Sequence, residues 1–303
     1  MENIDDNKSI IVTGASGLVG EHFIHALEGL GERRLYALYY KNFCKFKRSK
    51  SLKLDITNRS DLLSLRCLRP KLLIHCAAMT GISNCEGDSK RAFQVNVHGT
   101  ENLVALSKQT GAKLVYLSTD AVFDGEVGGY TEKDRPSPQH HYGKTKLIGE
   151  DSCISGNHTA LIVRTNLFGE GRRMKRDGFV ADLLRSLHEG QIYHAFGDAL
   201  FSPLYVRTFV HAVLDLLDRK AKGIFHLVGS ESLTKYAFAK LIAEIFSFDT
   251  SLVRRATIKS LSIARERRLD LSNKKVLAYL ERKEMPKVQE MLKEFKNNRG
   301  KNG

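Results

Sequence analysis

The chain has 303 residues, 42% apolar and 27% charged, which suits a globular enzyme with one large α/β domain, or a core domain with a smaller lobe. The formal net charge is +14, but the basic stretches lie far apart and no nucleic-acid-binding motif accompanies them. We therefore interpret the excess as solvated basic faces or as attraction for phosphate-bearing ligands, and expect no nucleic-acid partner.

The chain offers no sign of membrane, secreted or metal-binding character. Its N-terminus is polar, and no apolar run reaches the roughly 18 to 20 residues that cross a bilayer. Five scattered cysteines form no C-x-x-C pair, and the histidines lack a complementary ligand set. We expect a cytoplasmic protein with reduced thiols, without a membrane partner and without a metal.

Apolar runs alternate with helical patterns through the first half of the chain. The runs predict buried strands at residues 9–14, 34–40, 72–78, 112–119 and 159–165. Between the third and fourth of these, residues 90–112 predict one long amphipathic helix closed by Gly111. This alternation predicts a Rossmann-type doubly wound parallel sheet with helices on both faces.

In the second half, apolar runs and helical patterns alternate less regularly, which predicts a smaller α/β lobe. Helices are expected at 179–190, 206–218 and 233–246 and in much of the last forty residues, with a strand at 222–229. We predict a dinucleotide-binding domain at 1–165 and a mainly substrate-binding lobe at 166–303. Segments near 198–230 are expected to return to the first domain.

Three glycines follow the first predicted strand, in the run TGASGLVG. Gly14, Gly17 and Gly20 would allow a tight turn and a close approach of the backbone to a pyrophosphate at the helix N-terminus. Because the triplet lies between a strand and a helix, it predicts dinucleotide binding. Its G-x-x-G-x-x-G spacing resembles that of short-chain dehydrogenases/reductases. The loop contributes cofactor candidates Gly14, Ser16, Gly17, Leu18, Val19 and Gly20.

The end of the second strand indicates which dinucleotide binds. An acidic residue there would bond the ribose hydroxyls of NAD, but this strand ends in Tyr40 and is followed by Lys41. The absence of an acidic residue at the strand end and the presence of the basic Lys41 favour binding of NADP, with its 2′-phosphate, over NAD. The resemblance places Asp55 and Ile56 near the adenine, and Cys76, Ala77 and Ala78 beneath the middle of the cofactor.

A tyrosine and a lysine stand four positions apart at Tyr142 and Lys146, on one face of a predicted helix. The pairs Tyr236/Lys240 and Tyr279/Lys283 have the same spacing, but only Tyr142 follows closely on a strand that ends in Ser118 and Thr119. Ketone reduction needs a proton donor, and a nearby ammonium lowers the pKa of a tyrosine from its usual value near 10. We expect Lys146 to lower the pKa of Tyr142 and Thr119 to hold the carbonyl oxygen.

The motifs STD-x-VFDG, Y-x-E-x-D-x-P-x-P and YGK-x-K-x-GE together resemble the dTDP-4-dehydrorhamnose reductase family, which are extended short-chain dehydrogenases. The resemblance covers nearly the whole chain and implies a catalytic triad of Thr119, Tyr142 and Lys146. It implies NAD(P)H-dependent reduction of a 4-keto-6-deoxy sugar carried on a nucleotide diphosphate, and it allows a homodimer. Asn96 matches the family asparagine of the central helix. Further substrate candidates are Thr80, Asp120, Val122, Arg172 and Arg173.

Other functions remain open at the level of sequence. A 4,6-dehydratase would follow its threonine with Asp-Glu, whereas Asp120 is followed here by Ala121. An epimerase is a further alternative. The β subunit of methionine adenosyltransferase resembles this family and regulates a partner without turnover. Asn84 and Ala121 depart from the residues usual in the reductases, which keeps that regulatory alternative open. His140 and His141 are expected at the surface beside Tyr142.

Overall fold

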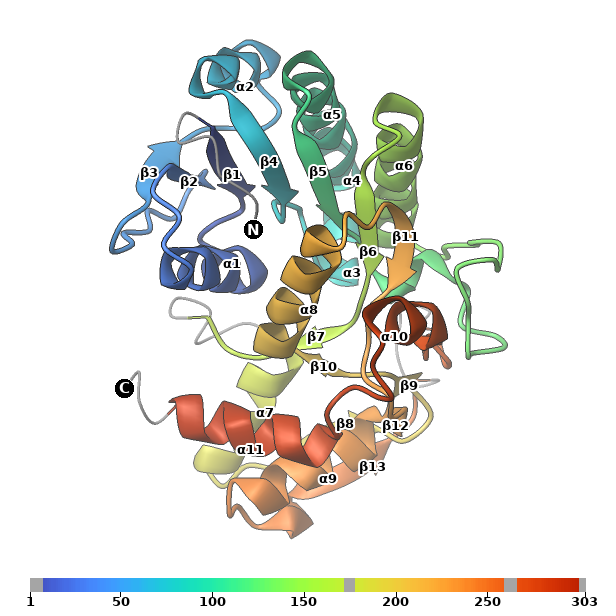
Figure 1. Cartoon of the computed structure of the whole chain (residues 1–303). Helices are drawn as coiled ribbons and strands as arrows, with labels where there is room; N and C mark the ends of the chain where they lie inside the picture. The colour runs from blue at the N-terminus through green and yellow to red at the C-terminus, as the bar shows by residue number, and fades with distance from the viewer. Residues whose placement is uncertain (1–7, 172–177, 259–265, 300–303) are drawn as a thin grey trace.

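The computed structural model describes residues 8–171, 178–258 and 266–299. A seven-stranded sheet forms its centre, in the order β11-β6-β5-β4-β1-β2-β3, and every pairing in it is parallel (Figure 1). This confirms the predicted Rossmann-type α/β class. The strands are β1 (Ser9–Thr13), β2 (Leu35–Tyr39), β3 (Lys50–Lys53), β4 (Pro70–His75), β5 (Lys113–Leu117), β6 (Leu161–Arg164) and β11 (Gly223–His226).

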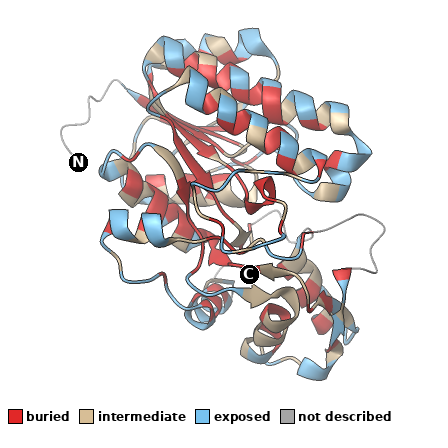
Figure 2. Ribbon diagram, turned by 90° about the vertical axis from the view of Figure 1, so that its right-hand side faces the viewer, coloured by how far each residue is buried: buried red, intermediate tan, exposed pale blue. Residues whose placement is uncertain are grey.

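Helices cover both faces of this sheet, as the alternating side chains of its strands require. Ile10 and Val12 of β1 face the helices α1 (Leu18–Gly29) and α8 (Val206–Asp218), whereas Ile11 faces the opposite layer. That layer is formed by α2 (Arg59–Ser64), α5 (Gly99–Thr110) and α6 (His141–Gly156). Figure 2 shows the central strands buried between helices whose outer faces are exposed.

The second half of the chain adds a lobe at the carboxyl edge of the sheet. Its strands pair in twos: β7 (Leu167–Phe168) with β10 (Leu204–Tyr205), β8 (Tyr193–Phe196) with β13 (Val253–Ala256), and β9 (Leu200–Phe201) with β12 (Leu233–Thr234). The helices α7 (Phe179–His188), α9 (Lys235–Ile245) and α11 (Val288–Arg299) pack around them, while α10 (Lys274–Leu280) packs on β11 (Figure 1). Within the lobe, the ring of Phe168 lies 5.2 Å from that of Phe238 and 6.2 Å from that of Phe295.

The long helix predicted at residues 90–112 is confirmed, with its C-cap at Gly111, and it contains one π-helical turn that was not predicted. The segment follows α3 (Ile82–Gly87) and consists of α4 (Ser89–Phe93), a π-helical turn at Gln94–His98, and α5. A β-carbon at Gly99 would lie 2.6 Å from the side chain of Ile56, so the helix passes very close to the loop after β3. The wider turn places Asn96 against the loop after β4, where it contributes to the site.

Short 3₁₀ turns occur at Leu65–Leu68, Asp120–Val122 and Thr250–Leu252. The five cysteines, which all lie in the described part of the chain, form no disulfide bonds. Within the described residues, no helix is long and apolar enough to cross a membrane, and no group of three or more histidine, cysteine or acidic side chains could hold a metal ion.

Candidate active site

A cavity of about 900 Å³ lies where the central strands end and the lobe begins. The loops after β1, β2, β4, β5 and β6 form its sheet side, and α7, α9 and β9 form its opposite wall. In open parallel sheets, ligands bind at this edge, beyond the carboxyl ends of the strands. The predicted site residues that line the cavity are Gly14, Ser16, Gly17, Leu18, Val19, Gly20, Tyr40, Lys41, Asp55, Ile56, Cys76, Ala77, Ala78, Thr80, Thr119, Asp120, Tyr142 and Lys146.

The glycine loop is packed so tightly that side chains would not fit. Gly14 has φ +65°, and a β-carbon there would lie 2.7 Å from the backbone nitrogen of Ala77. A β-carbon at Gly20 would lie 2.3 Å from the carbonyl oxygen of Gly14. Gly17 caps α1 without a side-chain hydrogen bond, which leaves the first N–H groups of the helix for a ligand. The loop therefore fits the pyrophosphate of a dinucleotide.

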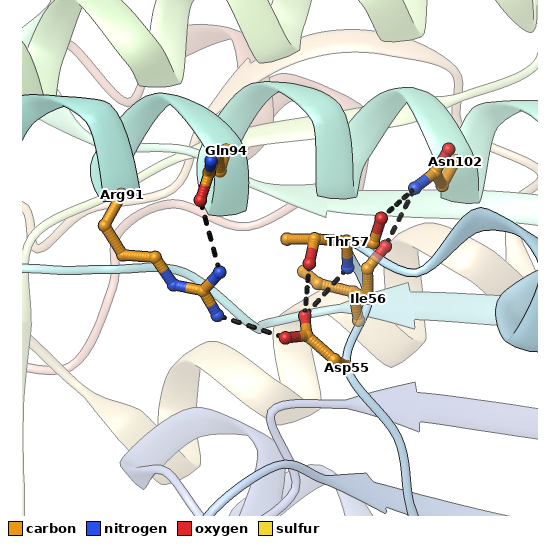
Figure 3. A network of polar contacts seen from close by, with 6 residues as sticks. All are labelled: Asp55, Ile56, Thr57, Arg91, Gln94 and Asn102. Carbon is orange, nitrogen blue, oxygen red and sulfur yellow. Dashed lines mark hydrogen bonds and ion pairs between the residues drawn. The ribbon is translucent and has the colours of Figure 1, made fainter.

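Asp55 organises one end of the cavity (Figure 3). It accepts hydrogen bonds from the backbone and hydroxyl of Thr57, at 2.9 and 2.8 Å, and from Arg91 at 3.1 Å. Burial alone would raise the pKa of Asp55, but these bonds together lower it. Asp55 is thus held as a carboxylate, with Arg91 fixed beside it.

Arg91 was not predicted as a site residue, although it lines the cavity. Its guanidinium lies 5.6 Å from the centre of the Tyr40 ring, and the Lys41 ammonium lies 5.9 Å from the same ring. Arg91 belongs to the short helix α4, whose N-cap is Asp88. Nothing in the local sequence distinguishes it from an ordinary exposed arginine, because only the packing of α4 against the loop after β3 brings it to Tyr40.

The predicted catalytic residues meet at the opposite end of the cavity. Thr119 follows β5, and its hydroxyl donates to Asp120 at 3.0 Å and accepts from the backbone of Ala121 at 3.2 Å. Tyr142 stands in the first turn of α6 and, like Thr119, lines the cavity. Asn166 donates to the other oxygen of Asp120. Thr119, Asp120 and Asn166 thus form one hydrogen-bonded chain in the cavity that Tyr142 also lines.

The expected lowering of the Tyr142 pKa by Lys146 is wrong. Burial raises the pKa of Tyr142 well above its usual value, the bond with Thr119 opposes this, and Asp120 adds to it. Lys146 is 3% exposed, and its ammonium lies 4.0 Å from the centre of the Tyr116 ring. Burial lowers the pKa of Lys146 to about 8, although Cys153, Glu150 and Cys76 act in the other direction.

Asn96 is a positioning residue rather than part of the cavity wall. Its side-chain oxygen accepts from the backbone of Met79 at 2.8 Å, while its nitrogen donates to the Met79 carbonyl and to Thr145, each at 3.0 Å. These bonds use both N–H groups of the amide, and Asn96 does not line the cavity, so direct contact with a cofactor is corrected to a supporting role. Asn96 ties the loop after β4 to the helix that carries Tyr142 and Lys146.

Two further predictions need correction. Val122 is fully buried in a small apolar cluster with Phe123 and does not line the cavity, because the 3₁₀ turn after Thr119 rotates it inward. His140 is 5% exposed rather than at the surface: it caps α6 by accepting from the backbone of Gly143 at 3.0 Å, and its other ring nitrogen lies 2.9 Å from Glu266.

Other predictions concern residues in more open positions. His141 is exposed, as expected. Asn84 donates to the carbonyl of Thr80 at 3.1 Å and thereby shapes the loop after β4. Arg172 and Arg173 lie outside the described residues.

The two rival tyrosine–lysine pairs do not line this cavity. Lys240 donates to the carbonyl of Thr250 at 2.8 Å, and its ammonium lies 5.8 Å from the centre of the Tyr236 ring. Tyr279 donates to the carbonyl of Arg219 at 2.9 Å. Both pairs therefore make local contacts in the second half of the chain.

A cavity running from a glycine-opened helix to a tyrosine, a threonine and a lysine is the arrangement of short-chain dehydrogenases/reductases. The chain is an NAD(P)-dependent oxidoreductase of that class. Comparison with known families gives the closer assignment. The family model "RmlD substrate binding domain" matches residues 8–298, and the chain belongs to this family.

Three relatives illustrate its range. "Probable low-salt glycan biosynthesis reductase Agl14" of Haloferax volcanii is 31% identical over 86% of this chain and 89% of its own length. "Methionine adenosyltransferase 2 subunit beta" of Rattus norvegicus is 30% identical over 83% of this chain and 76% of its own length. The structure of dTDP-4-dehydrorhamnose reductase from Bacillus anthracis in complex with NADP superposes with a TM-score of 0.85. It is 28% identical and covers 96% of this chain and 99% of its own.

Proposed function

We propose that this chain reduces the 4-keto group of a 6-deoxy sugar linked to a nucleotide diphosphate, with NADPH as hydride donor. The observation that carries the proposal is that Tyr142, Lys146 and the hydrogen-bonded pair Thr119–Asp120 line the same cavity as the glycine loop. A relative of the same family, from Bacillus anthracis, is a dTDP-4-dehydrorhamnose reductase solved with NADP.

Each residue has a defined part in this reaction. The nicotinamide supplies the hydride, and reduction leaves a developing negative charge on the ketone oxygen. Tyr142 donates its proton to that oxygen, and Thr119, which lines the cavity with it, holds the oxygen. The glycine loop and the first turn of α1 hold the pyrophosphate, and Asn96 fixes the loop beneath the cofactor. Lys146 orients the cofactor from the face of α6 that it shares with Tyr142.

The proposed preference for NADPH over NADH is supported by the cations beside Tyr40. β2 ends at Tyr39 without an acidic residue, and both Lys41 and Arg91 lie within 6 Å of the Tyr40 ring centre (5.9 and 5.6 Å). Two cations at this end of the cavity favour a 2′-phosphate. Comparison of kcat/KM for the two cofactors tests this, and a clear preference for NADH would contradict it.

The deciding experiment measures NADPH oxidation by the purified protein against a panel of nucleotide-linked 4-keto-6-deoxy sugars. Tyr142→Phe should abolish reduction and leave NADPH affinity nearly unchanged, because the phenyl ring keeps the packing and loses only the proton. Tyr236→Phe is the matched control, since Tyr236 lies outside the cavity. Equal loss in both variants would refute the assignment of Tyr142.

A second candidate function is supported by the 30% identity to the methionine adenosyltransferase β subunit. In that case the chain would bind NADP and regulate a partner. Tight NADP binding without turnover of any sugar in the panel, and a co-purifying partner, would favour it.

We further propose a cytoplasmic homodimer in which residues 1–165, with segments near 198–230, hold the cofactor. The remainder of 166–303 would then bind the substrate.

A further inference from the structure

Lys235 is a cation on the lobe side of the cavity that the proposed reaction does not use. It is the first residue of α9, and its side chain lines the cavity between the rings of two phenylalanines. The ammonium lies 3.3 Å from the centre of the Phe201 ring and 5.1 Å from that of Phe179. An ammonium over aromatic faces is attracted by the rings but keeps its capacity to donate hydrogen bonds.

The position of Lys235 separates it from the other described cations of the cavity. Lys41 and Arg91 lie beside Tyr40 at the end of β2, and Lys146 belongs to α6 on the sheet side. Lys235 is the one described cation on the lobe wall, opposite the glycine loop. A ligand that meets Lys235 therefore occupies the space between the cofactor-binding edge and the lobe, where the substrate must enter.

No carboxylate of the described residues lies within ion-pair distance of Lys235. Burial lowers the pKa of Lys235 to about 8, and Asp120 is the acid that acts in the opposite direction. Asp120 already accepts from Thr119 and Asn166, and burial raises its own pKa. The cavity thus holds an incompletely neutralised ammonium, which an anionic oxygen would complement.

We propose that Lys235 is a substrate-binding residue that donates a charge-assisted hydrogen bond to a phosphate oxygen of a nucleoside diphosphate. This rests on the proposed function, since it assigns the anionic part of that substrate to a particular side chain. The phenylalanine faces beside the ammonium exclude water and strengthen the interaction.

A carboxylate on the sugar would offer the same anionic oxygens as a diphosphate. Direct binding distinguishes the two sources. Thymidine diphosphate and inorganic pyrophosphate carry only the phosphate chemistry, and a uronic acid carries only the carboxylate. Calorimetric titration of each into the NADPH-saturated protein should give binding of thymidine diphosphate and no binding of the uronic acid. The reverse order would overturn the assignment to phosphate.

The variants Lys235→Met, Lys235→Arg and Lys240→Met test the residue itself. Lys240 belongs to the same helix and lies outside the cavity, so it controls for loss of a lysine from α9. Loss of a hydrogen bond to a charged group should weaken thymidine diphosphate binding by about 10- to 100-fold in Lys235→Met, and the arginine should restore most of it. Lys240→Met should bind like the unchanged protein. NADPH affinity should be the same in all four proteins, which verifies folding.

In the reductase assay, Lys235→Met should raise the KM for the nucleotide sugar by a similar factor and change kcat by less than about threefold, as expected for binding that is uniform through the reaction. If the unchanged protein turns over and Lys235→Met keeps its KM and its affinity for thymidine diphosphate within about twofold, the inference is wrong while the reductase function stands. If the unchanged protein binds no nucleoside diphosphate and reduces no nucleotide sugar, both the inference about Lys235 and the proposed reductase function are wrong.

Discussion

A buried ion pair supports the helix that carries Tyr142 and Lys146. Glu150 lies one further turn along α6, on the same face, and is 1% exposed, while Arg164 at the end of β6 is 2% exposed. The Arg164 Nε donates to the two carboxylate oxygens at 3.0 and 3.2 Å, and its terminal nitrogen donates at 2.6 Å. Ser118 donates to the same carboxylate. The pair therefore joins α6 to the strand ends beneath the site.

We predict that Glu150→Gln lowers the free energy of unfolding by about 3–5 kcal/mol, because the guanidinium of Arg164 would stay buried without a countercharge. The Ser118 hydroxyl would also lose a charged acceptor. The double variant Glu150→Met/Arg164→Met should recover most of the loss, since apolar side chains of similar volume need no partner. Chemical denaturation at pH 7, followed by circular dichroism, measures both.

The exposed pair Arg219–Glu281 is the matched control for this prediction. Its nitrogen and oxygen are also 3.0 Å apart, but the side chains are 41% and 78% exposed. Glu281→Gln should leave the free energy of unfolding unchanged, because solvent screens the pair. If Glu150→Gln costs less than about 1 kcal/mol, or the double variant is as unstable as the single one, the ion pair does not support α6 in the way described.

Two further predictions concern stability and cofactor binding. Lys146→Met should stabilise the protein at pH 7 by about 1–3 kcal/mol while abolishing reduction, because burial holds the pKa of Lys146 near 8, below its unfolded value of 10.5. Between pH 8 and 10.5 the unfolded state therefore binds more protons than the folded state, and the free energy of unfolding of the original protein rises with pH through the Lys146 side chain. Denaturation at pH 8 and at pH 10.5 should show this rise in the original protein and not in the variant. Gly20→Ala should lose NADPH binding in a calorimetric titration because its β-carbon meets the Gly14 carbonyl oxygen at 2.3 Å. Gly29→Ala, at the end of the same helix with no atom within 4 Å, should instead stabilise by about 0.5–1 kcal/mol.

The parts of the fold that the sequence predicted are those governed by local pattern. The run at residues 9–14 is apolar because β1 is buried on both faces, and the glycines follow it directly in the chain. The edge strand β3, with the sequence KSLK and exposed ends, carries no such pattern and was missed. The π-helical turn was missed because no local pattern marks it, and the bonds that Asn96 makes within it reach Met79 and Thr145, which are distant in the chain.

The residues of the site divide in the same way, into those that the local sequence pattern predicts and those that only the packing of distant segments brings into place. Thr119 and Tyr142 are near each other in sequence and follow a recognisable strand, so their meeting could be predicted. Arg91 and Lys235 reach the cavity only through the packing of α4 and of the lobe, and neither residue has a local signature. His140 was misplaced for a similar reason, since its partner Glu266 comes from the other half of the chain.

The raised pKa of Tyr142 bears on which form of its side chain takes part in the proposed reaction. Four-residue spacing suggested that Lys146 would draw the tyrosine towards phenolate, yet the ammonium lies over Tyr116, and burial favours the phenol form of Tyr142. A phenol is the form that gives a proton to a developing alkoxide, and the phenolate that results takes the proton back in the reverse step. The raised pKa therefore supports Tyr142 as the proton donor of a reduction, while the free energies of the substrates set the direction of the net reaction.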